Sequence, residues 1–192
     1  DGLVACAGIG PHVEHPEAIV SLNYFGAVAV LAGLRPVLAA GTAPAAVAVS
    51  SNSSTLPGAD GPVATACLAG DETEVRRLAH GLDGHSCYGG SKRALALWVR
   101  RHAPGPDWAG AGIRLNAIAP GAVETPLLQG GLDHPLFGPA IRGFPIPTGG
   151  FGQPDDVAAA IAFLLGPDAR FFCGSVVFCD GGSDALFRPD AF

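Results

Sequence analysis

The stretch Pro44-Ala-Ala-Val-Ala-Val-Ser-Ser51 decides the fold, because it is a continuous apolar run that ends in two hydroxyl side chains. A run that is apolar on both faces is typical of a strand inside a parallel sheet, where helices cover both sides. Three similar runs occur at Leu3–Ala7, Ile113–Ala119 and Ser175–Cys179. The sequence therefore predicts an α/β protein built on buried parallel strands.

Segments with helical spacing of apolar residues separate these runs. They span Glu17–Leu34, Asp71–His80, Cys87–His102 and Pro154–Leu165. Pro36 is expected to end the first of them, because proline disrupts a helix interior. Strands that alternate with helices form parallel sheets with right-handed crossovers, so we expect one domain over residues 1–192.

The composition argues against several classes of partner. Apolar residues make up 48% of the chain, charged residues 15%, and the net charge is −6, so the protein is globular and mildly acidic. Arginines adjoin only in the pairs Arg76–Arg77 and Arg100–Arg101, which disfavours nucleic acid and anionic membranes as partners. The longest apolar run, Phe25–Leu34, is too short to span a bilayer. A cytoplasmic location is the expectation.

The five cysteines are odd in number and lack CxxC spacing, so we expect free thiols and no zinc site. The six histidines show no HxxxH or HExxH arrangement, and we expect them on the surface or in loops, with no metal bound. The sequence contains no methionine and starts with Asp1-Gly2 ahead of an apolar strand. This predicts a fragment or a processed chain.

The only lysine, Lys92, follows Tyr88 by four residues. On a helix this spacing places both side chains on one face, one turn apart. A phenol has a pKa near 10, and a neighbouring ammonium group favours the phenolate. We therefore expect Lys92 to lower the pKa of Tyr88 toward the range in which acid–base catalysis is efficient.

Several chemistry-bearing residues follow strands directly. Ser51 ends one strand, Pro120-Gly121 ends another, and Ala7-Gly8 ends the first, while Asn23 lies on the helix after the first strand. In a parallel sheet, ligands bind beyond the carboxyl ends of the strands. The sequence therefore predicts that these residues meet Tyr88 at one edge of the sheet.

With these residues in view, the chain resembles the short-chain dehydrogenase/reductase family. The matching segments, in family order, are Leu22-Asn-Tyr-Phe-Gly26, Val49-Ser-Ser51, Tyr88-Gly-Gly-Ser-Lys92, Arg114-Leu-Asn-Ala-Ile-Ala-Pro-Gly121, Glu124-Thr-Pro126 and Asp180-Gly-Gly182. The resemblance implies the C-terminal three-quarters of a Rossmann-type doubly wound parallel sheet, with the first three strands of the family fold absent.

The resemblance also implies hydride transfer between a nicotinamide cofactor and a secondary alcohol or ketone. Tyr88 would exchange the hydroxyl proton, and Lys92 would hold the nicotinamide ribose. Ser51 would donate to the carbonyl oxygen, although the neighbouring serines compete for this role and a strand-end serine can be a simple turn residue. Asn23 would hold a water that links Lys92 to solvent, or it would only brace the backbone.

The family pattern further implies NAD as cofactor, with NADP not excluded. Its predicted contacts are Ala7, Gly8, Tyr88, Lys92, Pro120, Gly121, Val123 and Thr125. Residues 120–153 would cover the substrate as a lid, through the side chains of Leu127, Leu128, Phe137 and Phe144. The implied substrate is a steroid or another hydrophobic carbonyl compound, and the implied assembly is a homodimer or homotetramer whose surface the insert at residues 51–86 reshapes.

Two departures from the family pattern leave alternatives open. The motif Asn-Asn-Ala-Gly appears as Ala5-Cys6-Ala7-Gly8, and no GxGxxG turn for the cofactor pyrophosphate is found. We therefore expect the 192-residue chain to bind cofactor weakly and to turn over poorly or not at all. The competing interpretations are a sugar epimerase or dehydratase on the same fold, and a truncated, inactive paralogue that serves as a binding module.

Overall fold

The computed structural model describes residues 1–191. Its centre is a four-stranded, all-parallel sheet in the order β1-β2-β3-β4. The strands are β1 (Gly2–Ala5), β2 (Ala45–Val49), β3 (Arg114–Pro120) and β4 (Val176–Cys179). Residues of β2 and β3 have side chains buried on both faces, as the continuous apolar runs predict. The first strand is shorter than expected and ends at Ala5.

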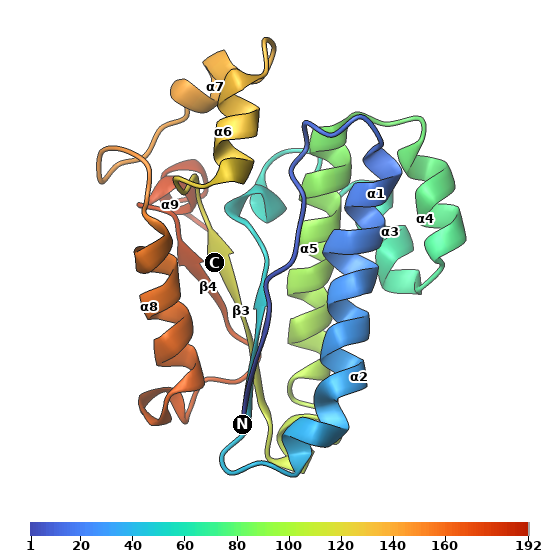
Figure 1. The fold of residues 1–192 in the computed structure, drawn as a ribbon, viewed down its shortest axis with the longest axis vertical. Coiled ribbons are helices and arrows are strands. Elements are labelled where there is room, and N and C mark those ends of the chain that lie inside the picture. The colour runs from blue at the N-terminus through green and yellow to red at the C-terminus, as the bar shows by residue number, and fades with distance from the viewer. Residues whose placement is uncertain (192) are drawn as a thin grey trace.

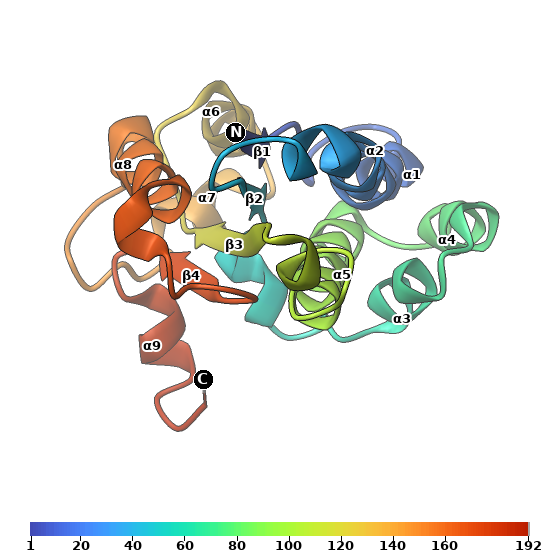
Figure 2. The same cartoon turned by 90° about the horizontal axis from the view of Figure 1, so that it is seen from below.

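Helices cover both faces of the sheet and its carboxyl end. The helical segments are α1 (Pro16–Val20), η1 (Ser21–Gly26), α2 (Ala27–Ala39), η2 (Asn52–Thr55), α3 (Pro62–Ala69), α4 (Glu72–Ala79), α5 (Gly84–His102), η3 (Ala109–Ala111), α6 (Pro126–Asp133), α7 (Gly138–Arg142), α8 (Pro154–Leu165), η4 (Pro167–Ala169) and α9 (Ser183–Phe187). Figures 1 and 2 show α2 and α5 on one face and α8 on the other, with α6 and α7 above the carboxyl ends of the strands.

The helix after β1 is longer than predicted. It runs without interruption from Pro16 to Ala39 through the π-helical segment η1, and Pro36 lies inside it. By length and composition this 24-residue helix is able to cross a membrane. The side chains of Ile19 and Leu31 are nevertheless fully buried in the protein core, as they are in the core helices of soluble domains.

Two other helices were not anticipated. The helix α3 lies in the Ser-, Gly- and Pro-rich insert, and α9 lies in the tail, where no periodic apolar pattern marks it. The predicted helix at Asp71–His80 is confirmed as α4, whose N-cap is Asp71. The helix at Pro154–Leu165 is confirmed at both ends.

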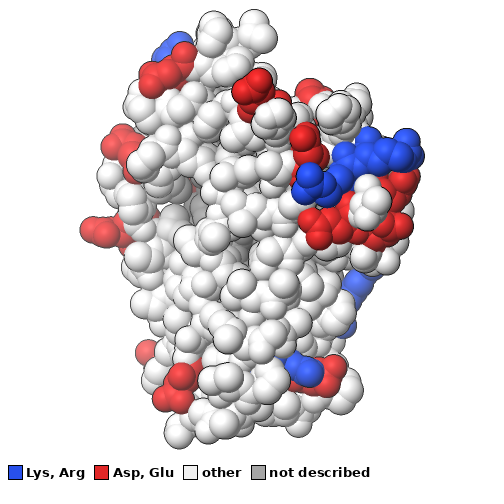
Figure 3. All heavy atoms as spheres, turned by 45° about the vertical axis from the view of Figure 1, so that its right-hand side comes forward, with Lys and Arg blue, Asp and Glu red and all other residues white. Residues whose placement is uncertain are grey.

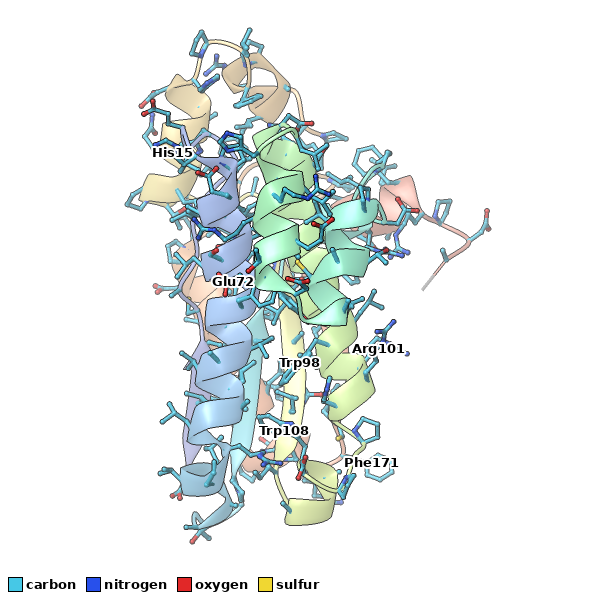
Figure 4. All side chains as sticks on the ribbon, turned by 90° about the vertical axis from the view of Figure 1, so that its right-hand side faces the viewer. His15, Glu72, Trp98, Arg101, Trp108 and Phe171 are labelled. Carbon is cyan, nitrogen blue, oxygen red and sulfur yellow. The ribbon has the colours of Figure 1, made fainter. Side chains whose placement is uncertain are left out.

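Aromatic packing closes the core at the amino end of the sheet. Trp98 of α5 and Trp108 meet edge to face with ring centroids 6.0 Å apart, and both are buried. Figure 4 shows both indoles low on the molecule, between α5 and the sheet, whereas Phe171 points away at the lower margin. Phe171 is 98% exposed, so it contributes nothing to this core.

Part of the Arg114–Gly121 motif has a structural role. The Arg114 guanidinium donates hydrogen bonds to the carbonyl oxygens of Leu164, Leu165, Gly166 and Ala169 at 2.8–3.1 Å. These bonds satisfy carbonyl groups at the end of α8 that have no partner within the helix. The Asn116 side chain links the backbones of Phe172 and Ser175. Two motif residues thus fasten α8 and β4 to β3.

Glycine permits the close packing of α5 on α3. A Cβ atom on Gly90 would lie 2.8 Å from Val63 Cβ, whereas a Cβ on Gly33 of α2 would meet nothing within 4 Å. We expect Gly90→Ala to lower the free energy of unfolding by about 1–3 kcal/mol through overpacking. The matched Gly33→Ala should raise it by about 0.5–1 kcal/mol through helix propensity. Urea denaturation measures both, and equal effects would contradict this packing.

Candidate active site

The predicted catalytic residues converge where β2 ends and α5 begins. Ser51 follows β2 directly and is 8% exposed, while Tyr88 and Lys92 lie on successive turns of α5. The Lys92 Nζ atom lies 5.8 Å from the centroid of the Tyr88 ring. The structure therefore brings together three side chains that are up to 41 residues apart in the sequence.

Lys92 is tied to the end of β2 by two hydrogen bonds. Its Nζ donates to the Val49 carbonyl oxygen at 2.8 Å, and the Ser50 hydroxyl donates to the Lys92 carbonyl oxygen at 2.8 Å. Lys92 is only 4% exposed, and this burial lowers its pKa to about 8. The Ser50 hydroxyl is thus occupied by the backbone of α5, whereas Ser51 borders both cavities at the cluster.

The pKa of Tyr88 differs from the prediction. Burial of the phenol raises its pKa, and the hydrogen bond with Ser51 opposes that rise. The predicted lowering by Lys92 is therefore wrong for the protein without ligands, because desolvation of the phenol outweighs the effect that lowers its pKa. Tyr88 is a neutral phenol at neutral pH in this state.

Asn23 lies behind the cluster. Its Oδ1 accepts from the Ile9 amide and its Nδ2 donates to the Ile9 carbonyl oxygen, both at 2.9 Å. Asn23 is fully buried within the π-helical segment η1, and its side chain borders neither cavity at the cluster. Of the two roles weighed for Asn23, this geometry favours the backbone brace.

A cavity of about 450 Å³ opens beside Lys92 at the carboxyl ends of β1, β2 and β3. Its walls include most of the predicted cofactor contacts, namely Gly8, Tyr88, Lys92, Pro120, Gly121, Val123 and Thr125. Ala7 is exposed and does not line it, whereas Cys6 does.

A second, smaller cavity of about 240 Å³ lies on the other side of Tyr88. All four predicted lid residues line it, namely Leu127, Leu128, Phe137 and Phe144. They come from α6, α7 and the adjoining loops, which Figure 1 shows above the carboxyl ends of the strands. Ser51 and Tyr88 border both cavities. The two hydroxyl groups therefore lie between the cavity that contains Lys92 and the smaller cavity, whose walls are mainly apolar.

Two histidines also line the smaller cavity, which the sequence did not predict. His12 lies in a turn and His85 is exposed, as expected of surface or loop residues, and both line the cavity wall. The His12 ring packs against α6 at Gly130, where only glycine leaves room. A Cβ atom on Gly130 would lie 2.6 Å from His12 Nε2. Only the spacing of His85 and Tyr88, one helical turn apart on α5, could have signalled this placement.

The histidines surround an aromatic ring of the predicted lid. His85 meets Phe137 edge-on at 4.3 Å between centroids, and His134 stacks on the same ring at 4.2 Å. Burial lowers the pKa of His85, the nearby His134 and His12 lower it further, and Asp83 opposes them. The His85 imidazole is therefore neutral at neutral pH, which suits an apolar ligand.

The largest cavity, of about 1090 Å³, lies away from this cluster, beside β4 and α9. Its walls include Asp180, Asp184 and Arg188 but not Ser51, Tyr88 or Lys92. Asp184 and Arg188 pair with each other at 2.8 Å, so their charges are satisfied within the protein. We therefore assign the chemistry to the two smaller cavities.

The structure also addresses metal ligation and surface charge. Within residues 1–191, no group of three or more His, Cys, Asp and Glu is arranged to hold a metal ion, and all five cysteines are free thiols. Figure 3 shows the charged side chains around the margin of the face it presents, with the densest group at its upper right, while the middle of that face is largely without Lys, Arg, Asp or Glu.

The burial of Lys92 predicts a dependence of stability on pH. Between about pH 8 and 10.5 the unfolded chain binds a proton at Lys92 that the folded chain has lost, so this residue makes the free energy of unfolding rise with pH. At about 1.4 kcal/mol per pH unit, the rise across that interval is about 3 kcal/mol. The substitution Lys92→Met removes this contribution to the pH dependence.

Urea denaturation of both proteins at pH 7.5, 9 and 10.5 measures this effect. The thiols and Tyr24 titrate in both proteins, so the difference in stability between them isolates Lys92. We expect the free energy of unfolding of the variant, relative to that of the wild type, to fall as pH rises, and a constant difference would contradict a lowered pKa for Lys92.

Comparison with known proteins agrees with this geometry. The family profile described as "Enoyl-(Acyl carrier protein) reductase" matches residues 79–184. The chain is 44% identical over 196 residues to the 3-alpha-hydroxysteroid dehydrogenase/carbonyl reductase of Comamonas testosteroni, covering 100% of this chain and 76% of that protein.

Solved structures give the same result. The 3-alpha-hydroxysteroid dehydrogenase from Pseudomonas sp. B-0831, complexed with NADH, is 49% identical with a TM-score of 0.96, over 100% of this chain and 76% of that chain. Levodione reductase is 25% identical with a TM-score of 0.74, over 96% of this chain and 67% of that chain. With a tyrosine, a lysine and a serine gathered at the carboxyl end of a parallel sheet, the chain belongs to the short-chain dehydrogenase/reductase family.

Proposed function

We propose that this protein is an oxidoreductase that transfers a hydride between NAD and a secondary alcohol or ketone, with a steroid or a similar hydrophobic carbonyl compound as substrate. The observation that carries this proposal is the position of Ser51 and Tyr88 between two cavities. One cavity holds the buried ammonium group of Lys92, and the other is walled mainly by apolar side chains. A reaction between a polar cofactor and an apolar substrate needs such a boundary.

The residues of the 450 Å³ cavity beside Lys92 fit a nicotinamide group. Gly8 leaves space there, since a Cβ on it would lie 3.1 Å from Asn23 Oδ1 and 3.5 Å from Lys92 Nζ. Lys92 would bind the ribose hydroxyls, and the backbone after Pro120 together with Thr125 would hold the ring and its phosphate. The nicotinamide cofactor supplies the hydride when it is bound.

The chain itself supplies the proton and the electrostatic support. In ketone reduction, the neutral Tyr88 phenol donates its proton to the carbonyl oxygen, where negative charge develops. Its raised pKa keeps that proton available at neutral pH. The Ser51 hydroxyl donates a second hydrogen bond to the same oxygen, and both donors are held in place before the reaction. Lys92 stabilises the phenolate that remains.

The relatives support the substrate class. Those from Comamonas testosteroni and Pseudomonas sp. B-0831 are named as hydroxysteroid dehydrogenases, and the second was solved with NADH. In this chain the walls formed by Leu128, Phe137 and Phe144 match an apolar ring system. The lid role of residues 120–153, a cytoplasmic location and assembly into a homodimer or homotetramer stay predictions.

Replacing the hydroxyl groups tests the chemistry. We expect Tyr88→Phe to lower kcat for ketone-dependent NADH oxidation by at least about 1000-fold, and Ser51→Ala by about 10- to 100-fold, because each removes a donor to the developing oxyanion. Initial rates at 340 nm, measured at high protein concentration, give both values.

Ser50→Ala is the matched control, because the Ser50 hydroxyl bonds the Lys92 backbone and not the substrate. It should lower stability by about 1 kcal/mol while it affects kcat much less than Ser51→Ala does. A Tyr88→Phe variant as active as the wild type would overturn the proposed function.

The smaller cavity predicts substrate selectivity. Phe137 lines it, whereas the adjacent Leu136 is 77% exposed and does not. We expect Phe137→Ala to lower kcat/KM for a steroid ketone by about tenfold or more while it changes acetone reduction little, because only the large substrate reaches this ring. Leu136→Ala should change neither rate. Equal losses for both ketones would show that Phe137 does not contact the substrate.

A further inference from the structure

Ser51 has a hydrogen-bond donor that the proposed chemistry does not use. The Ser53 hydroxyl donates to Ser51 Oγ at 2.9 Å, and the Ser53 amide donates to the same oxygen at 3.2 Å. Ser53 also lines the smaller cavity together with Ser51 and Tyr88. Three hydroxyl groups therefore form a row from Ser53 through Ser51 to Tyr88.

This row constrains the single proton of Ser51. A serine hydroxyl has one proton to donate and two lone pairs that accept. When Ser53 fills both acceptor positions of Ser51 Oγ, the Ser51 proton is left for a different partner. The Tyr88 phenol lines the same cavity, and hydrogen bonding with Ser51 opposes the rise of its pKa, so its oxygen is the acceptor to which we assign this proton.

The turn that carries Ser53 is anchored by the two residues that follow it. Within η2, the Thr55 hydroxyl donates to Asp184 Oδ1 at 2.6 Å, which anchors the turn to α9. Arg93 of α5 donates to the Ser54 carbonyl oxygen at 3.2 Å. Contacts with α5 and α9 therefore hold the turn in which the Ser53 hydroxyl meets Ser51.

We propose that Ser53 is a positioning residue, whose hydroxyl orients the Ser51 proton. Without substrate this proton points toward the Tyr88 oxygen, and with substrate it points toward the substrate oxygen bound beside Tyr88. Hydrogen bonds in a row polarise one another, so the donation from Ser53 also strengthens the donation from Ser51. The part of this proposal that concerns the substrate oxygen rests on the proposed function. The part that concerns Tyr88 does not, because it involves only this chain.

Titration of Tyr88 tests the proposal without cofactor or substrate. The chain has two tyrosines, and burial raises the pKa of both, that of Tyr24 to about 12, so the step that belongs to Tyr88 is the one that is missing from the Tyr88→Phe variant. Ultraviolet absorbance at 295 nm, recorded from pH 8 to 12, follows this step. Tyr88→Phe assigns it, and circular dichroism over the same range checks that the fold is intact.

We expect Ser53→Ala to lower the ionisation constant of Tyr88 by about threefold or more, because the charge-assisted bond to the phenolate weakens. Ser51→Ala should lower it further, and adding Ser53→Ala to Ser51→Ala should change nothing more, because Ser53 acts through Ser51. Ser53→Thr should restore the wild-type value. Ser54→Ala, which removes the neighbouring hydroxyl of the same turn, is the matched control and should leave the titration unchanged.

The proposal is overturned if Ser53→Ala titrates like the wild type, if Ser51→Ala has no effect, or if the two substitutions add independently. A kinetic measurement separates this outcome from failure of the proposed function. Where ketone reduction is observed, Ser53→Ala should lower kcat with little change in KM. Where no reduction is observed, the proposed function fails, and the tyrosine titration still decides the role of Ser53.

Discussion

The site depends on two hydrogen bonds that join the end of β2 to the middle of α5. Lys92 Nζ donates to the Val49 carbonyl oxygen, and the Ser50 hydroxyl donates to the Lys92 carbonyl oxygen. Because both bonds are buried, breaking either would leave a polar group without a partner, at a cost of about 1–3 kcal/mol. This reciprocal link sets the separation between Ser51 and Tyr88.

Burial makes this link strong, and it also changes the electrostatics of the site. The environment that isolates Lys92 from water lowers its pKa to about 8 and raises that of Tyr88. Desolvation thus moves an amine and a phenol in opposite directions, each toward its neutral form. In the protein without ligands, Tyr88 keeps its proton, and a further positive charge would be needed to favour the phenolate. Burial, and not the Tyr–Lys spacing, therefore sets the protonation state of Tyr88.

Much of the fold followed from local pattern. The strands, α4, α5 and α8 were predictable because apolar periodicity and capping residues such as Asp71 act over a few residues. Pro36 misled the prediction, since the helix around it continues to Ala39 while packing against the sheet. The helices α3 and α9 carry weak local signals and are held by contacts with α5 and η2. Tertiary packing therefore decided what propensity left open.

The sequence by itself determined the type of sheet, the order of its elements and the Tyr88–Lys92 pair, because buried strands and short motifs are local properties. Only the tertiary structure decided which serine hydroxyl is bonded to α5 and that Asn23 braces Ile9. It also decided that His12 and His85 line the smaller cavity and that Ala7 does not line the cavity beside Lys92. Each of these depends on distances between residues far apart in the chain. No local pattern encodes such distances, and packing alone sets them.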